Sequence, residues 1–133
     1  MYAALIEGMD KSLGDLLDQL RRRGAERNTI VLFLSDNGGL SAAGRGGTPN
    51  THNAPLSSGN GSAGEGGLRV PMLVRWPGIG RPGSTCHRYV MVDDVPPTLL
   101  EATGVGPKLA APPTVDGASF APLLRGEAAA AAQ

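Results

Sequence analysis

The run T-I-V-L-F-L-S-D-N-G-G, from Thr29 to Gly39, constrains the fold more than any other stretch of the chain. Six residues suited to a buried strand lead an acid and an amide into a glycine turn. A second strand is predicted over Val70–Trp76, with Pro71 near its start and Pro77 directly after it. Strands this apolar are typical of a parallel α/β sheet, which must be covered on both faces. With 20 glycines and 11 prolines, the chain has too few other elements to cover one well, so we expect part of a larger domain.

Asp36 and Asn37 stand at the predicted carboxyl end of the first strand. Ligands and metals collect outside the carboxyl ends of strands in open parallel sheets, and carboxylate and carboxamide oxygens suit a hard cation such as calcium or magnesium. The two residues therefore form a candidate metal site. The alternative is a plain turn, because Asx-Gly is a common turn signal without any ligand.

The first segment predicts an amphipathic helix that ends at Gly24, a residue suited to a left-handed helix stop. Helix followed by strand gives half of a right-handed crossover unit. The apolar stripe of the helix consists of Tyr2, Leu5, Ile6, Met9, Leu13, Leu16, Leu17 and Leu20.

Charge and composition exclude several classes of function. Twelve basic and 12 acidic residues cancel, so no general field attracts nucleic acid, and the cluster Arg21–Arg23 reads as a solvated helix end. No apolar run approaches the ~20 residues of a membrane span. A single cysteine, Cys86, excludes an intrachain disulfide.

Several separate segments together match one family in its own order. They are Y-A-A-L-I-E-G-M-D-K-S-L-G (Tyr2 to Gly14), L-S-D-N-G-G (Leu34 to Gly39), N-A-P-L (Asn53 to Leu56), G-N-G-S-A-G-E-G-G-L-R-V-P-M-L-V-R-W-P-G (Gly59 to Gly78), D-V-P-P-T-L-L-E-A-T-G (Asp94 to Gly104) and D-G-A-S-F-A-P-L-L-R-G (Asp116 to Gly126). On these motifs the chain resembles the sulfatases, sulfuric ester hydrolases of the alkaline-phosphatase-like superfamily. The E-G-G-L-R-V-P block after S-D-N-G is the most specific of them.

The resemblance implies an incomplete α/β sulfatase domain over residues 1–126, with parallel-type strands, flanking helices and long Gly/Pro-rich loops, and an Ala-rich tail over 127–133. It implies that Asp36 and Asn37 belong to a calcium site and that the substrate of the parent protein is a sulfate ester. Sulfatases use a formylglycine made from a C-x-P-S-R or S-x-P-S-R motif, which this sequence lacks. No signal peptide precedes the helix, whereas many sulfatases are exported.

The loop from Leu40 to Leu68 has the composition of a low-complexity linker. By resemblance it crosses the active-site mouth, and the residue between Gly59 and Gly61 is ordinarily a sulfate-binding lysine. Here that residue is Asn60, a weaker donor to charge on sulfate. Arg45 in the same loop is a candidate for the missing charge. Glu65 and Arg69 are expected to pair structurally rather than act in catalysis.

The remaining segments suggest two further helices and no catalytic residues. Asp93–Thr103 predicts a helix with Asp94 as N-cap and Val95, Leu99 and Leu100 facing inward, and Ser119–Leu124 predicts a shorter one. His52 and His87 lack a metal-ligand partner at useful spacing and are expected to be surface residues. Cys86 does not match the nucleophile motif of the family and is expected to be inert.

Three interpretations of function stay open on the sequence. The chain is a piece of a sulfatase, a piece of a phosphate or phosphonate ester hydrolase of the same superfamily, or a degenerate remnant. The remnant would at most bind a partner through the apolar face of its first helix. The missing nucleophile motif predicts that the chain alone is inactive.

Overall fold

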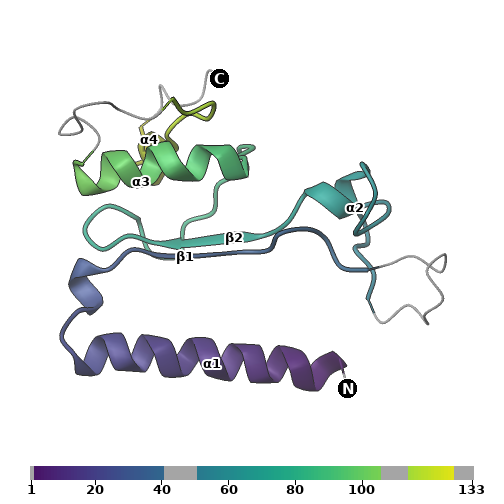
Figure 1. Ribbon diagram of the computed structural model, residues 1–133, viewed down its shortest axis with the longest axis horizontal. Helices are drawn as coiled ribbons and strands as arrows, with labels where there is room; N and C mark the ends of the chain where they lie inside the picture. The colour runs from purple at the N-terminus through teal and green to yellow at the C-terminus, as the bar shows by residue number, and fades with distance from the viewer. Residues whose placement is uncertain (1, 41–50, 106–113, 128–133) are drawn as a thin grey trace. The chain divides into compact units, whose positions relative to one another are not determined.

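A computed structural model describes residues 2–40, 51–105 and 114–127 of the chain (Figure 1). Contacts divide the chain into two units, residues 1–77 and 78–133. The first unit contains both strands, and the second contains two of the α-helices. None of the helices within the described ranges is both long and apolar enough to cross a membrane.

The first unit opens with helix α1, Tyr2–Arg22, which confirms the predicted amphipathic helix. Gly24 follows with a φ of 65°, the left-handed conformation that ends a helix most easily at glycine. A 3-10 turn, η1 (Glu26–Asn28), then leads into the first strand. No residue of α1 is buried, because η1 is the one element among the described residues that contacts this helix.

Strand β1, Val31–Leu34, pairs with strand β2, Met72–Arg75, within the two predicted segments. The pair is antiparallel, with Val31 opposite Arg75 and Leu34 opposite Met72 (Figure 1). The prediction of a parallel pair is therefore wrong for these strands. Apolar runs occur in buried strands of parallel and of antiparallel pairs, so the sequence pattern did not fix the direction. In this pair β2 begins beside the end of β1.

This register decides what lies beside the carboxyl end of β1. In a parallel pair the carboxyl ends of both strands would share one edge. In the antiparallel pair, Leu34 lies opposite Met72 at the amino end of β2. The short helix α2, Glu65–Leu68, which precedes β2, is therefore brought next to the turn that follows β1.

In the second unit a 3-10 turn, η3 (Val92–Asp94), leads into helix α3, Val95–Thr103. Asp94 is the N-cap residue as predicted, but its carboxylate makes no capping bond. The carboxylate instead accepts hydrogen bonds from the backbone N–H groups of Met91 and Ala118, each at 2.8 Å. Gly104, with a φ of 63°, ends the helix as expected.

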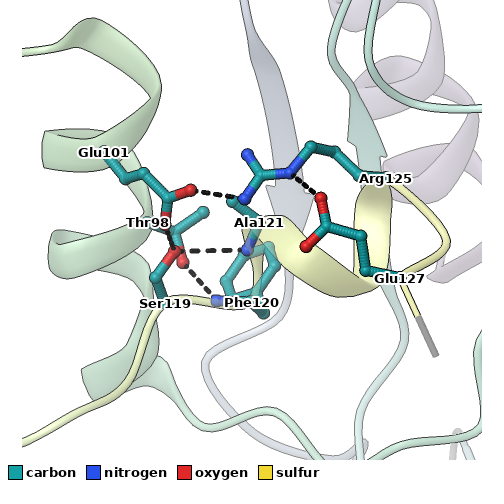
Figure 2. A network of polar contacts seen from close by, with 7 residues as sticks. All are labelled: Thr98, Glu101, Ser119, Phe120, Ala121, Arg125 and Glu127. Atoms are coloured by element: carbon teal, nitrogen blue, oxygen red, sulfur yellow. Dashed lines mark hydrogen bonds and ion pairs between the residues drawn. The ribbon is translucent and has the colours of Figure 1, made fainter. Parts of the chain in front are cut away.

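Helix α4, Ala121–Leu124, lies within the predicted Ser119–Leu124 segment and joins α3 through polar contacts (Figure 2). Thr98 is 3% exposed; its hydroxyl donates to the Asp94 carbonyl at 2.6 Å and accepts from the Phe120 N–H at 2.9 Å. Leu99, predicted to face inward, is 40% exposed. The prediction for Leu99 is wrong because the face of α3 that meets α4 is the one carrying Thr98.

A second set of contacts in this unit centres on the carboxylate of Glu101. Arg125 Nη2 donates to Glu101 Oε1 at 2.6 Å, and Ser119 Oγ donates to Glu101 Oε2 (Figure 2). The hydrogen bond from Ser119, followed by that from Arg125, lowers the pKa of Glu101 below its usual range. Arg125 Nε also donates to Glu127 at 2.7 Å, so α3, α4 and the residues after α4 are linked.

Candidate functional site

The turn after β1 carries Asp36 and Asn37, the predicted metal ligands. Asp36 is exposed and Asn37 partly buried. Asn37 Nδ2 donates to Asp36 Oδ2 at 2.6 Å, so the two side chains lie against each other. Ser35 Oγ donates to the Asn37 carbonyl at 2.7 Å and closes the turn on itself.

Asn60, the third predicted site residue, lies directly on this pair although it is 23 residues further along the chain. Its Nδ2 donates to Asn37 Oδ1 at 2.6 Å. The side chains of Asp36, Asn37 and Asn60 thus form one hydrogen-bonded row, which we call the polar row. The structure therefore brings together Asp36, Asn37 and Asn60, three of the residues that the sequence singled out for this site.

Glycines allow close contact between the turn after β1, residues 35–39, and the segment of residues 57–67. Gly38 N–H donates to the Gly67 carbonyl at 2.9 Å, and Gly66 N–H donates to the Ser57 carbonyl at 2.8 Å. A Cβ on Gly38 would lie 1.7 Å from Gly66 O, and one on Gly66 would lie 2.3 Å from Ser58 O. No side chain fits at either position, so the E-G-G block is a backbone contact surface.

Asn53 is a residue of this site that the sequence matched only as part of N-A-P-L. Its Oδ1 accepts from Gly39 N–H at 3.0 Å, while its Nδ2 donates to the carbonyls of Gly39 at 2.9 Å and Ser58 at 3.0 Å. A lone asparagine in a Gly/Ser-rich loop gives no periodic signal, so its partners could not be read from the sequence.

The other residues singled out in the sequence are not part of the polar row. Arg69 pairs with Glu65 at 3.6 Å, which confirms the structural role predicted for both. The two histidines are exposed, as predicted, and Cys86 is exposed as well. Arg45 lies outside the described residues.

Asp36 and Asn37 suit calcium in ligand type, because each offers a hard oxygen. Asn37 Oδ1 keeps a second lone pair beside the hydrogen bond from Asn60. Within the part of the chain that the structure describes, no group of three or more His, Cys, Asp and Glu side chains gathers in one place. The two residues thus fit one side of an oxygen shell that needs ~6 to 8 ligands.

Comparisons with known proteins bear on the same segments. The family model described as Sulfatase matches residues 1–105. A sulfatase of Formosa agariphila is 36% identical over 95% of this chain, and the steryl-sulfatase of Mus musculus is 37% identical over 96%. An endo-4-O-sulfatase of Bacteroides thetaiotaomicron is 33% identical over 96%. The chain belongs to the sulfatase family.

A solved structure agrees with this placement. The crystal structure of Ps i-CgsB in complex with k-i-k-neocarrahexaose matches 91% of this chain with a TM-score of 0.76 and 32% sequence identity. The match covers 25% of that protein. Among the three curated relatives, the chain spans 23%, 20% and 23% of their length. The chain therefore corresponds to about a quarter of a sulfatase or less.

Proposed function

We propose that the chain forms the later part of a sulfatase catalytic domain of the alkaline-phosphatase-like class, and that the whole protein hydrolyses a sulfate ester. Family membership and the names of the relatives support this proposal. The observation that carries it is the polar row. Residues 23 positions apart are hydrogen-bonded at 2.6 Å, at the turn where the family resemblance expects metal and sulfate ligands.

In this proposal Asp36 and Asn37 hold calcium through one carboxylate and one carboxamide oxygen. Bound there, calcium would orient a sulfate oxygen and polarise the ester. Asp36 contributes the only negative charge of the polar row. Because Asp36 is exposed, a calcium ion bound to its carboxylate could also be bound by ligands from the rest of the whole protein. The Asp36 carboxylate can only accept a hydrogen bond, so its bond from Asn37 Nδ2 fixes which atom of the Asn37 amide is the oxygen.

Asn60 stands where the family ordinarily has a lysine, so it presents a neutral N–H donor to the substrate. A neutral donor stabilises charge developing on sulfate oxygens less than an ammonium does. We propose a formylglycine nucleophile in the whole protein, made from a motif that lies outside these 133 residues.

The coding DNA before the Met1 codon tests this proposal first. We expect a C-x-P-S-R or S-x-P-S-R coding stretch, in frame or displaced by one frameshift, with an Asp-Asp pair before it. The corresponding whole protein should then hydrolyse a chromogenic aryl sulfate in a calcium-dependent way, and Asp36→Ala should lower kcat/KM at least ~100-fold. Unrelated upstream sequence, or full activity of Asp36→Ala, would contradict the proposal and favour a degenerate remnant.

A further inference from the structure

Asn53 connects the two loops that carry the polar row. The Oδ1 atom of its carboxamide accepts one hydrogen bond and the Nδ2 atom donates two, all at 2.9 to 3.0 Å. Toward Gly39 it accepts from the N–H and donates to the carbonyl, as a strand neighbour would. Toward Ser58 it donates once. One side chain therefore joins two backbone segments 19 residues apart, as the positions 39 and 58 show.

The two segments are those that place the ends of the polar row. Gly39 follows Asn37 by two residues, and Ser58 precedes Asn60 by two. The Gly39 carbonyl also accepts from the Asn60 backbone N–H at 3.2 Å. The same carbonyl thus contacts both Asn53 and Asn60, and the Asn60 side chain then reaches Asn37 Oδ1.

The contact depends on residue 39 having no side chain. A Cβ there would lie 2.8 Å from Thr51 Oγ1 and 3.4 Å from Asn53 Oδ1. The first distance is too short for a Cβ, so the Thr51 side chain would have to shift, while 3.4 Å is the lower limit of ordinary van der Waals contact. Gly39 therefore leaves space beside its backbone, and the Asn53 carboxamide occupies the adjoining position, where it is hydrogen-bonded to the Gly39 N–H and carbonyl.

We propose that Asn53 is a positioning residue that holds Asn60 against Asn37 and thereby fixes the orientation of the Asn37 carboxamide. The orientation is set from both ends, because Asn37 donates to Asp36 and accepts from Asn60. That this orientation prepares Asn37 to bind a metal rests on the function proposed above. The consequence for the polar row rests on the hydrogen bonds alone.

Hydrogen exchange of the Asn60 side-chain amide in the full 133-residue chain, followed by ¹⁵N–¹H spectroscopy, tests this role. In Asn53→Ala we expect this exchange to accelerate about tenfold, because the hydrogen bonds that hold the loop are lost. Asn53→Asp keeps the shape and the acceptor but neither donor, so it should accelerate exchange as much. The backbone amides of β1 and β2 should keep their wild-type rates in both variants.

Thr51→Val is the matched control, because it removes one nearby bond, from Thr51 Oγ1 to the Leu40 carbonyl at 2.8 Å. It should leave the Asn60 amide unchanged. An Asn60 amide that exchanges freely in the wild type, or an unchanged rate in Asn53→Ala, would overturn the proposal. Equal acceleration of the strand amides would also overturn it, since that result is a general loss of stability.

Calcium added to the wild-type chain separates this proposal from the function on which its consequence rests. Movement of the Asn37 amide signals with calcium supports both. Unmoved Asn37 signals at calcium concentrations high enough to reveal the weak binding expected of this chain, together with the expected exchange pattern in the variants, support the positioning role while contradicting the calcium assignment.

Discussion

At the residue scale, the site depends both on polar side chains and on glycines that have no side chain. Asp36, Asn37 and Asn60 supply the polar atoms, and Gly38 and Gly66 let the backbones that carry them touch. A hydrogen bond between loops tolerates little displacement, since it weakens steeply beyond ~3.2 Å. The glycines therefore matter to the site as much as the asparagines do.

Gly38→Ala is expected to separate the two loops of the site. The new Cβ would meet Gly66 O at 1.7 Å, so the backbone must move, at a cost of ~1–3 kcal/mol in the free energy of unfolding. Urea unfolding measures this loss. Gly14→Ala in α1 is the control, because nothing lies within 4 Å of its Cβ; it should stabilise the chain by ~0.5–1 kcal/mol. Equal effects of the two variants would contradict the close contact at Gly38.

Asn60→Lys tests the weak donor of the polar row. In the whole protein we expect kcat/KM for an aryl sulfate to rise about tenfold or more, because an ammonium stabilises sulfate charge better than an amide does. Steady-state kinetics measure the change. Asn60→Gln keeps a neutral amide and should show no rise, so a lysine variant no better than the glutamine variant would contradict this role.

At the element scale, the buried side chains among the described residues gather where α3 meets the start of α4. Among the described residues, the buried hydrophobic side chains are Phe120 and Ala121, and the buried polar side chain is Thr98. The junction is thus a small apolar contact around one hydroxyl. A buried donor without a partner costs more than a hydrogen bond contributes when it is made, so the hydroxyl of Thr98 is critical there.

Thr98→Val should destabilise the second unit by ~1–3 kcal/mol, because the Phe120 N–H loses its acceptor while the shape of the side chain is kept. Thermal or urea unfolding measures the loss. Thr103→Val is the matched control on the same helix, where the hydroxyl is exposed and donates to the Leu99 carbonyl. We expect its effect to stay within ~0.5 kcal/mol, and similar effects of both variants would refute the role of Thr98.

The Glu101 carboxylate makes the α3–α4 contact sensitive to acid. Its pKa is lowered by Ser119 and then by Arg125, so the charged form is favoured in the folded state. The resulting stability is present above the usual carboxyl pKa and is lost as the pH falls through that range to the lowered value. Because the Glu101 side chain is 38% exposed, solvent screening keeps the contribution small.

Glu101→Gln should therefore lower stability at pH 7 and flatten its decline between about pH 5 and 3. Unfolding midpoints measured across that range test the expectation. Glu127→Gln, which removes the other carboxylate partner of Arg125, should leave the slope of the wild type nearly unchanged. A Glu101→Gln slope as steep as that of the wild type would exclude this carboxylate as the cause.

At the scale of the whole molecule, the chain carries more apolar surface than it covers. On α1, five large apolar side chains are between 44% and 66% exposed: Tyr2, Leu5, Ile6, Met9 and Leu16. A stripe of this kind ordinarily packs on a sheet or another helix. Because the chain spans about a quarter or less of its relatives, this face is consistent with a surface that is covered in a whole sulfatase.

The isolated chain is accordingly expected to bind an apolar fluorescent dye and to have little function of its own. It should show no aryl sulfate turnover, and calcium should bind only weakly, because two ligands make a small part of a shell of ~6 to 8. Dye fluorescence, titration calorimetry and a sulfatase assay measure the three properties. Tight calcium binding or calcium-dependent turnover by the pure chain would contradict the fragment interpretation.

Sequence patterns predicted the local elements well, because local elements depend on local periodicity and on special residues. The stripe of α1, the stop at Gly24, the strand segments and the end of α3 at Gly104 all follow from neighbours within a few positions. The Glu65–Arg69 ion pair follows from one helical turn. The family membership was also visible in the motifs.

Tertiary structure alone decided how these elements meet. An apolar strand pattern carries no direction, so the antiparallel register of β1 and β2 was not available from the sequence. That register sets the turn after β1 beside α2, and the loop then places Asn53 and Asn60 against Gly39 and Asn37. The sequence by itself determined which residues are candidates for the site. Pairings across 14 and 23 residues are not set by neighbours in the sequence, so only the fold determined that these residues touch.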